Sequence, residues 1–352
     1  MATAQSDHIR AAIQLRSRRS TTSRIIDWVR TKPEGGIAVL FLTVQLVVIV
    51  VSLVYPGFRY LDPANIAVML KAIAPLGVMA LGVSVLMIAG EFDLSVGALY
   101  SFCSIVAATL TMTWGGDIGA DMPSAIAPFA GLAVGLLLGT LAGVLHAVIT
   151  LRFNIPSFIT TLGAMLMWKG ATLLYHGAQS LRFKPSEPFN TLFNSSIGVV
   201  HASMIWFVLL AIAFYFLLHH HRLGNHFFAV GGNRNAAVAI GVNPARTKII
   251  AFAICGFMAA FSGILAGTRV MSIQPGGGLG LELQAIAACV IGGAALNGGR
   301  GSILGVVLGT ALMYTIQDLL LLLRAPGFYF DMFVGGLIVI SVITNMAIRR
   351  KG

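Results

Sequence analysis

Polar side chains interrupt two otherwise apolar parts of the sequence, and their types suit contact with a polar solute. They are carboxylates, an amide and a hydroxyl: Glu91, Asp93, Ser95, Glu282, Gln284 and Asp318. A carboxylate at the centre of a membrane costs about 2.5–3.5 kcal/mol, so it is kept there where it faces protein or water. We expect these six residues to line a polar path. The alternative is that they lie at a membrane surface, where a carboxylate costs little.

Glycine-rich breaks surround these side chains. The first break is Gly90–Gly97; the second is Gly276–Gln284, followed by Gly292-Gly293 and Asn297–Gly301. Broken backbone at membrane depth must be covered by protein or water rather than lipid. Two such interruptions at corresponding places in two halves are typical of internally repeated transporters.

A third polar stretch, Gly224–Lys248, is basic and contains no acidic residue. Pro244 and several glycines divide it into pieces too short to cross a membrane. Its small residues would let a short helix lie flat on a partner, with Gly232, Ala236, Ala237 and Gly241 expected at the contact. A plain connector between two spans is the alternative.

Catalytic patterns are missing from the sequence. No Gly-x-x-x-x-Gly-Lys-Ser/Thr run is present, so nucleotide hydrolysis of that type is excluded for this chain. Cys103, Cys255 and Cys289 each lie in an apolar run and fit no metal or disulfide spacing. We therefore expect no catalytic residue, no metal and no cofactor.

The composition indicates which elements must position these residues. The 352 residues are 57% hydrophobic and 10% charged, with a mean hydropathy of +0.88. Soluble domains have about 25% charged residues. The sequence therefore predicts an all-α, polytopic helical membrane protein in contact with lipid. The net charge of +11 does not indicate nucleic acid, because the positive residues gather at the ends of apolar runs.

About ten membrane elements are expected, one of them short. They are Gly36–Tyr55, Ile66–Ala89, Ser95–Trp114, Ala125–Thr150, Pro156–Tyr175, His201–Leu218, Ile249–Val270, Gln284–Leu296, Ser302–Leu323 and Met332–Ile348. These form one transmembrane domain over 36–348, which contains a cytoplasmic loop at 219–248. A basic tail at 1–35 and a short tail at 349–352 flank it. Glycines spaced four residues apart from Gly131 to Gly143 predict close contact with another helix.

Basic residues set the expected orientation. With the amino terminus inside, the outside loops hold only Arg59, Arg182, Lys184 and Arg324, whereas most other Lys and Arg residues face the cytoplasm. This distribution follows the positive-inside rule. It predicts that both termini are cytoplasmic and that 115–124 and 176–199 lie outside.

Three motifs in order carry a family resemblance. Gly90–Ala98 resembles the Asp-Leu-Ser-Val-Gly signature of permease subunits of bacterial ABC monosaccharide importers, of the ribose, xylose and arabinose type. Ala229–Lys248 resembles their cytoplasmic coupling loop, and Leu283–Gly309 resembles their second signature. The sequence departs from the family at Glu91, which adds a carboxylate, and at Leu145-His146-Ala147, where Asn-Gly is common.

The resemblance implies a function and a set of partners. It implies a permease in the bacterial inner membrane, working as a homodimer or heterodimer and receiving a monosaccharide or similar solute from a periplasmic binding protein. A separate cytoplasmic ATPase would dock on the coupling loop, at Gly231, Gly232, Asn233, Ala236, Ala237, Gly241 and Arg246. The alternatives are a secondary transporter driven by an ion gradient, which also has repeats and polar breaks, and a membrane enzyme.

Overall fold

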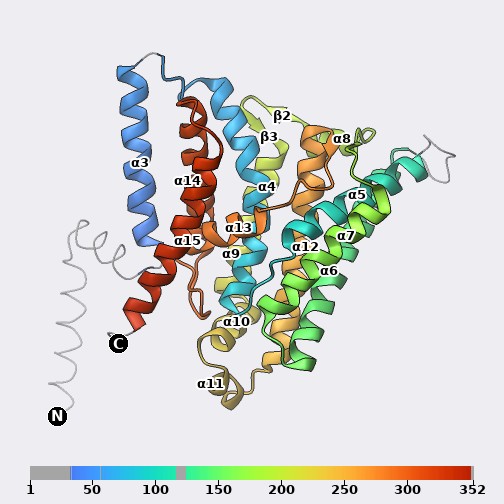
Figure 1. Ribbon diagram of the computed structural model, residues 1–352, viewed down its shortest axis with the longest axis vertical. Helices are drawn as coiled ribbons and strands as arrows, with labels where there is room; N and C mark the ends of the chain where they lie inside the picture. Colours follow the sequence, from blue (N-terminus) through green and yellow to red (C-terminus); the bar gives the residue numbers. More distant parts are fainter. Residues whose placement is uncertain (1–31, 33, 56, 116–123, 350–352) are drawn as a thin grey trace, which may run out of the picture.

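Helices form nearly all of the structure. The computed structural model describes residues 32, 34–55, 57–115 and 124–349. Each of the ten expected membrane elements is a helix: α3 (Gly35–Val54), α4 (Pro63–Ile88), α5 (Val96–Gly115), α6 (Ala127–Phe153), α7 (Ser157–His176), α9 (Ala202–His220), α12 (Pro244–Val270), α13 (Leu281–Ile291), α14 (Ile303–Leu322) and α15 (Phe328–Arg349). Seven described helices are long and apolar enough to cross a membrane. The predicted polytopic helical fold is confirmed (Figure 1).

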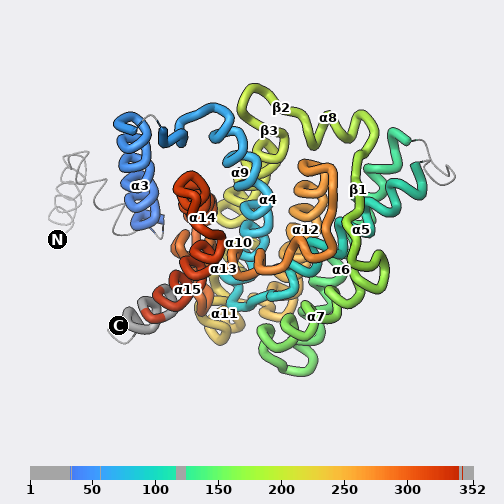
Figure 2. Tube along the Cα trace, turned by 45° about the horizontal axis from the view of Figure 1, so that its top comes forward, coloured from blue at the N-terminus to red at the C-terminus, as the bar shows by residue number. Residues whose placement is uncertain are grey.

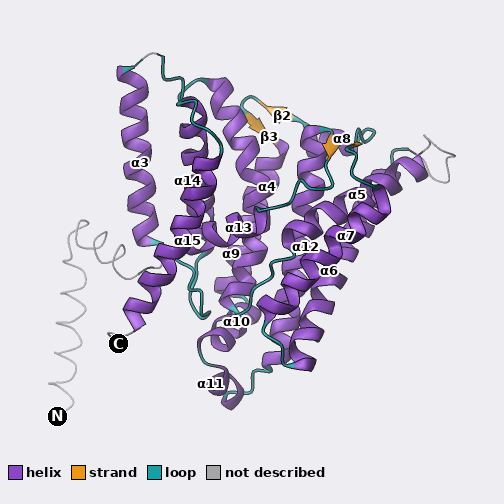
Figure 3. Cartoon of the chain, viewed as in Figure 1, coloured by secondary structure: helices purple, strands orange, loops and turns teal. Residues whose placement is uncertain are grey.

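Short elements occupy the two ends of the helical body. One end carries α8 (Phe189–Asn194) and two small antiparallel pairs, β1 (Leu181–Arg182) with β4 (Ser272–Ile273), and β2 (Ser196–Ile197) with β3 (Val200–His201). The opposite end carries α10 (Arg222–Gly232) and α11 (Arg234–Ala239). Figure 3 shows the helices running between these two ends, with α10 and α11 at the bottom. The expected polar loop at 219–248 therefore contains these two short helices, together with the last residues of α9 and the first residues of α12.

Helix α12 lies at the centre and packs against α4, α5 and α6 (Figure 2). The glycine row of α6 makes this packing close, as expected. A methyl group on Gly139 would lie 2.5 Å from the Gly256 carbonyl oxygen, and one on Gly143 would lie 2.2 Å from that of Phe252. Small residues in membrane helices permit this approach of backbones.

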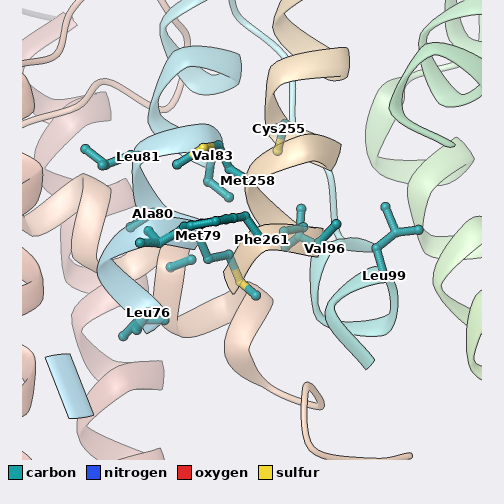
Figure 4. Packing of buried hydrophobic residues seen from close by; sticks show 14 of the residues in the cluster. Leu76, Met79, Ala80, Leu81, Val83, Val96, Leu99, Cys255, Met258 and Phe261 are labelled. Atoms are coloured by element: carbon teal, nitrogen blue, oxygen red, sulfur yellow. The ribbon is translucent and has the colours of Figure 1, made fainter. Parts of the chain in front are cut away.

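A buried apolar core joins α4 and α12. Met79 and Met258 are almost fully buried, and Figure 4 shows them beside Val83 and Phe261. Large apolar side chains also cover the outside of the body: Leu42 on α3 is 65% exposed and Leu174 on α7 is 91% exposed. Exposed apolar surface on this scale fits contact with lipid, as expected for a membrane protein.

The two breaks are real interruptions between helices. α4 ends at Ile88 and α5 begins at Val96, and the connection between them returns into the body in Figure 1. α12 ends at Val270, and the short helix α13 begins only at Leu281. The expected amino-terminal tail, apart from residues 32, 34 and 35, lies outside the described residues. So do most of the 115–124 loop and all but the first residue of the 349–352 tail.

Candidate functional site

The three motifs converge on one small contact, which we call the glycine junction. It consists of Gly90, Gly231, Gly232, Gly298 and Gly299 together with the carbonyl group of Ile88. These residues come from the end of α4, the end of α10 and the loop between α13 and α14. The backbone N–H of Gly299 donates to the Ile88 carbonyl oxygen over 2.9 Å. The segment expected to be cytoplasmic is therefore tied directly to both polar breaks.

A side chain does not fit at Gly231, Gly298 or Gly299 of the glycine junction. A methyl group on Gly231 would lie 1.9 Å from the Ile88 oxygen, and one on Gly298 would lie 2.8 Å from the Cα atom of Gly90. Gly90 and Gly298 also have positive φ angles, 83° and 82°. Glycine adopts this backbone conformation without the steric cost that other residues have.

An ion pair reinforces the same contact. Lys248, in the first turns of α12, pairs through Nζ with Glu91 Oε1, and their side chains are 17% and 13% exposed. The additional carboxylate at position 91 is thus matched by a basic residue of the motif that resembles the coupling loop. Both residues line a cavity of about 310 Å³ that also contacts Arg234 and Ser157.

Asp93 lies at the base of a buried polar chain rather than in an open channel. It is 1% exposed, and its Oδ1 accepts from the backbone N–H of Ser95 over 2.8 Å at the start of α5. Its Oδ2 lies 3.1 Å from Nδ1 of His146 on α6. On α7, Trp168 Nε1 lies 3.0 Å from Nε2 of the same imidazole.

The hydrogen-bond partners of His146 determine the tautomer of its imidazole ring. Trp168 Nε1 can only donate, so His146 Nε2 accepts and carries no proton. The remaining ring proton is then on Nδ1, which donates to Asp93. The carboxylate therefore positions α5 through Ser95 and is connected to α6 and α7 through the ring. Sequence reasoning noted His146 only as a departure from the family and missed this contact, because 53 residues separate it from Asp93.

The second break closes against the first. The backbone N–H of Gly278 donates to Ser101 Oγ over 3.0 Å, and a methyl group on Gly278 would lie 1.9 Å from the Gly97 carbonyl oxygen. Glu282 is 8% exposed in the first turn of α13, where its Oε1 accepts from Gly280 N–H over 3.1 Å. A carboxylate at a helix amino terminus is stabilised by the helix dipole. Glu91, Asp93, Ser95 and Glu282 thus lie close to contacts between broken segments.

The two remaining path candidates lie elsewhere. Asp318 of α14 is 8% exposed and accepts from Asn65 Nδ2 over 2.8 Å, which ties α14 to α4. It therefore forms an interhelical contact. Gln284 is half-buried in α13. Whether any of the six residues contacts a solute stays a prediction.

Most of the expected coupling residues are exposed, but Ala237 is not, which corrects our expectation for it. This residue is 1% exposed and packs inside its own chain, so it cannot contact a partner directly. Asn233 accepts from Ala236 N–H at the start of α11, and Gly241 has a φ angle of 83° in the turn that follows. Gly232, Ala236 and Arg246 are exposed. The large apolar residues exposed here are Val238 (55%) and Ile240 (74%), which the sequence did not single out because a six-residue helix has almost no readable periodicity.

Comparisons with known proteins agree with the three motifs. The family described as "branched-chain amino acid transport system / permease component" matches residues 65–342, and so includes both breaks, α10 and α11. The chain belongs to this permease family. The autoinducer 2 import system permease protein LsrC of Escherichia coli is 32% identical over 302 residues, which is 85% of this chain and 84% of the relative.

A second relative matches to a similar extent. The ribose import permease protein RbsC of Escherichia coli is 30% identical over 315 residues, covering 86% of this permease and 91% of the relative. No solved structure matches the chain significantly. The resemblance to permease subunits of ABC importers, seen first in the motifs, is confirmed.

Proposed function

We propose that this permease forms the translocation path of an ATP-driven importer for a monosaccharide or a similar polar solute. The names of the two relatives support a sugar-like solute. In this proposal a periplasmic binding protein delivers the solute, and two permease subunits enclose the path. ATP hydrolysis belongs to a separate cytoplasmic subunit. Residues 219–248 and both termini are then cytoplasmic, and the chain resides in the bacterial inner membrane.

The glycine junction is the observation that carries this proposal. It joins α10 to the end of α4 and to the loop before α14 without intervening side chains. Contacts between backbones leave little room for relative movement, because packed protein interiors transmit strain. A displacement of α10 and α11 by a docked ATPase would therefore reach both polar breaks. The proposed path at those breaks would open and close in response.

The exposed side of α11 is the proposed docking surface. Val238 and Ile240 present apolar side chains next to the exposed small residue Ala236. The fully buried core of an interface is more apolar than its rim, and charged residues are depleted there. A carboxylate introduced at either position would be buried without a partner on docking.

Co-purification with the ATPase subunit tests the proposal. We expect Val238→Asp and Ile240→Asp to insert and fold normally but to lose the ATPase during purification. Asn235→Ser, also an exposed position in α11, is the matched control and should retain it. Ala237→Asp is uninformative about docking, because it places a charge inside the chain. If both Val238→Asp and Ile240→Asp retain the ATPase at wild-type levels, this surface is not the docking site.

A further inference from the structure

A basic residue with an unsatisfied nitrogen lines a cavity beside the second break. The cavity has a volume of about 320 Å³ and lies between α5, α12 and the segment that connects α12 to α13. Its lining includes Tyr100, Arg269, Ser272 and Gln274. This volume is at the lower end of the range for small-molecule sites, about 300–1,000 Å³.

Arg269 has no internal partner among the described residues. Its Nε atom is buried and makes no hydrogen bond, and the described ion pairs do not include it. Arg269 is half-buried in the last turn of α12, and a cation kept partly out of water without a counter-charge is costly. An arginine that merely extended to the membrane surface would have its guanidinium nitrogens in water. Arg269 is half-buried and lines the cavity, so a ligand in the cavity can reach the cation.

A second cation, Lys71, acts on the same histidine as Arg269. Lys71 of α4 forms no ion pair among the described residues either. Burial, followed by the positive charges of Lys71 and Arg269, lowers the pKa of His201 at the start of α9. Both charges therefore act on the same region of the molecule.

The chemistry of the lining defines the ligand. A guanidinium binds a carboxylate through two parallel hydrogen bonds, which a neutral hydroxyl group cannot reproduce. The hydroxyl groups of Tyr100 and Ser272 and the amide of Gln274 suit the hydroxyl groups of a sugar chain. We propose that this permease carries an acidic sugar derivative, and that Arg269 binds its carboxylate group as it passes through the cavity. This inference rests on the proposed function of a sugar-type permease and specifies its solute.

Equilibrium dialysis on the full-length permease in lipid nanodiscs tests the inference. The probes are radiolabelled D-gluconate and D-glucitol, which have the same carbon chain and differ in a carboxylate against a hydroxymethyl group. We expect gluconate to bind and glucitol to bind at least about tenfold more weakly, because a half-buried cation without a counter-charge favours the charged ligand. Arg269→Gln should weaken gluconate binding at least about tenfold, with a smaller loss for Arg269→Lys.

Controls separate a specific loss from a folding defect. Arg152→Gln removes an exposed arginine from the last turn of α6 and should leave gluconate binding unchanged. Tyr100→Phe preserves the ring, removes one cavity hydroxyl group and should weaken binding several-fold, so the inference stays testable if Arg269→Gln does not fold. Three outcomes would overturn the inference. They are no binding of gluconate, equal binding of the two probes, and full gluconate binding by a folded Arg269→Gln variant. Arg269→Gln should still co-purify with the ATPase, so failure of this inference is distinct from failure of the proposed function.

Discussion

Gly231 and Ile88 are so close that only glycine fits at position 231. A methyl group there would lie 1.9 Å from the Ile88 carbonyl oxygen, the same oxygen that accepts from Gly299 N–H. Three segments that are distant in sequence thus depend on one backbone contact. In the proposed importer this contact transmits the movement of α10 to the polar breaks.

Gly231→Ala tests the glycine junction. The added methyl group must push the Ile88 carbonyl away, and overpacking of this kind costs about 1–3 kcal/mol. We expect normal membrane insertion, a lower thermal unfolding temperature and a strong loss of uptake. Gly232→Ala is the matched control, because its methyl group would lie 3.8 Å from the nearest atom, Gly299 Cα. Equal behaviour of the two variants would show that the junction is not a tight contact.

The Asp93–His146–Trp168 chain predicts a graded series. Asp93→Ala removes the acceptor for Ser95 and leaves His146 Nδ1 with only the Ser95 hydroxyl group, 3.3 Å away, so it should abolish uptake while the protein still inserts. His146→Ala leaves buried Asp93 Oδ2 unsatisfied, at a cost of about 1–3 kcal/mol or more for a charged group. Trp168→Phe removes only the outermost donor and should have the mildest effect. Uptake and thermal unfolding measure the series.

Glu91→Gln provides the comparison for Asp93. Its charge is partly exposed and paired with Lys248, so its loss removes one ion pair and leaves the start of α5 intact. We expect it to impair uptake less than Asp93→Ala. The reverse order would contradict the structural role assigned to Asp93.

Cysteine labelling tests the orientation. The three native cysteines are buried, so the wild-type protein should not react with a membrane-impermeant maleimide. In intact spheroplasts, Ser196→Cys should be modified, and Asn235→Cys should be modified only after the membrane is permeabilised. Both positions are exposed and lie at opposite ends of the helical body (Figure 1). Labelling in the opposite pattern would invert the proposed topology.

Sequence patterns predicted the helices well because a membrane span is long and its apolar run is continuous. They also located the breaks, since Gly90 and Gly298 stand out between apolar runs. The contacts between these segments could not be predicted, because no local sequence pattern indicates that Gly231 contacts Ile88 or that His146 contacts Asp93. Ala237 was placed on the wrong side because small residues suit a partner contact and an internal contact equally well. Arg269 was visible at the end of a span, but the sequence does not show that its Nε lacks a partner.

The energy source for uptake tests the central claim most directly. The permease, its ATPase and its binding protein should be reconstituted in proteoliposomes, with ATP enclosed and labelled solute outside. We predict uptake that requires enclosed ATP, stops when the ATPase is omitted and continues when a protonophore collapses the proton gradient. Uptake that continues without the ATPase and stops with the protonophore would contradict the account and identify an ion-driven secondary transporter instead.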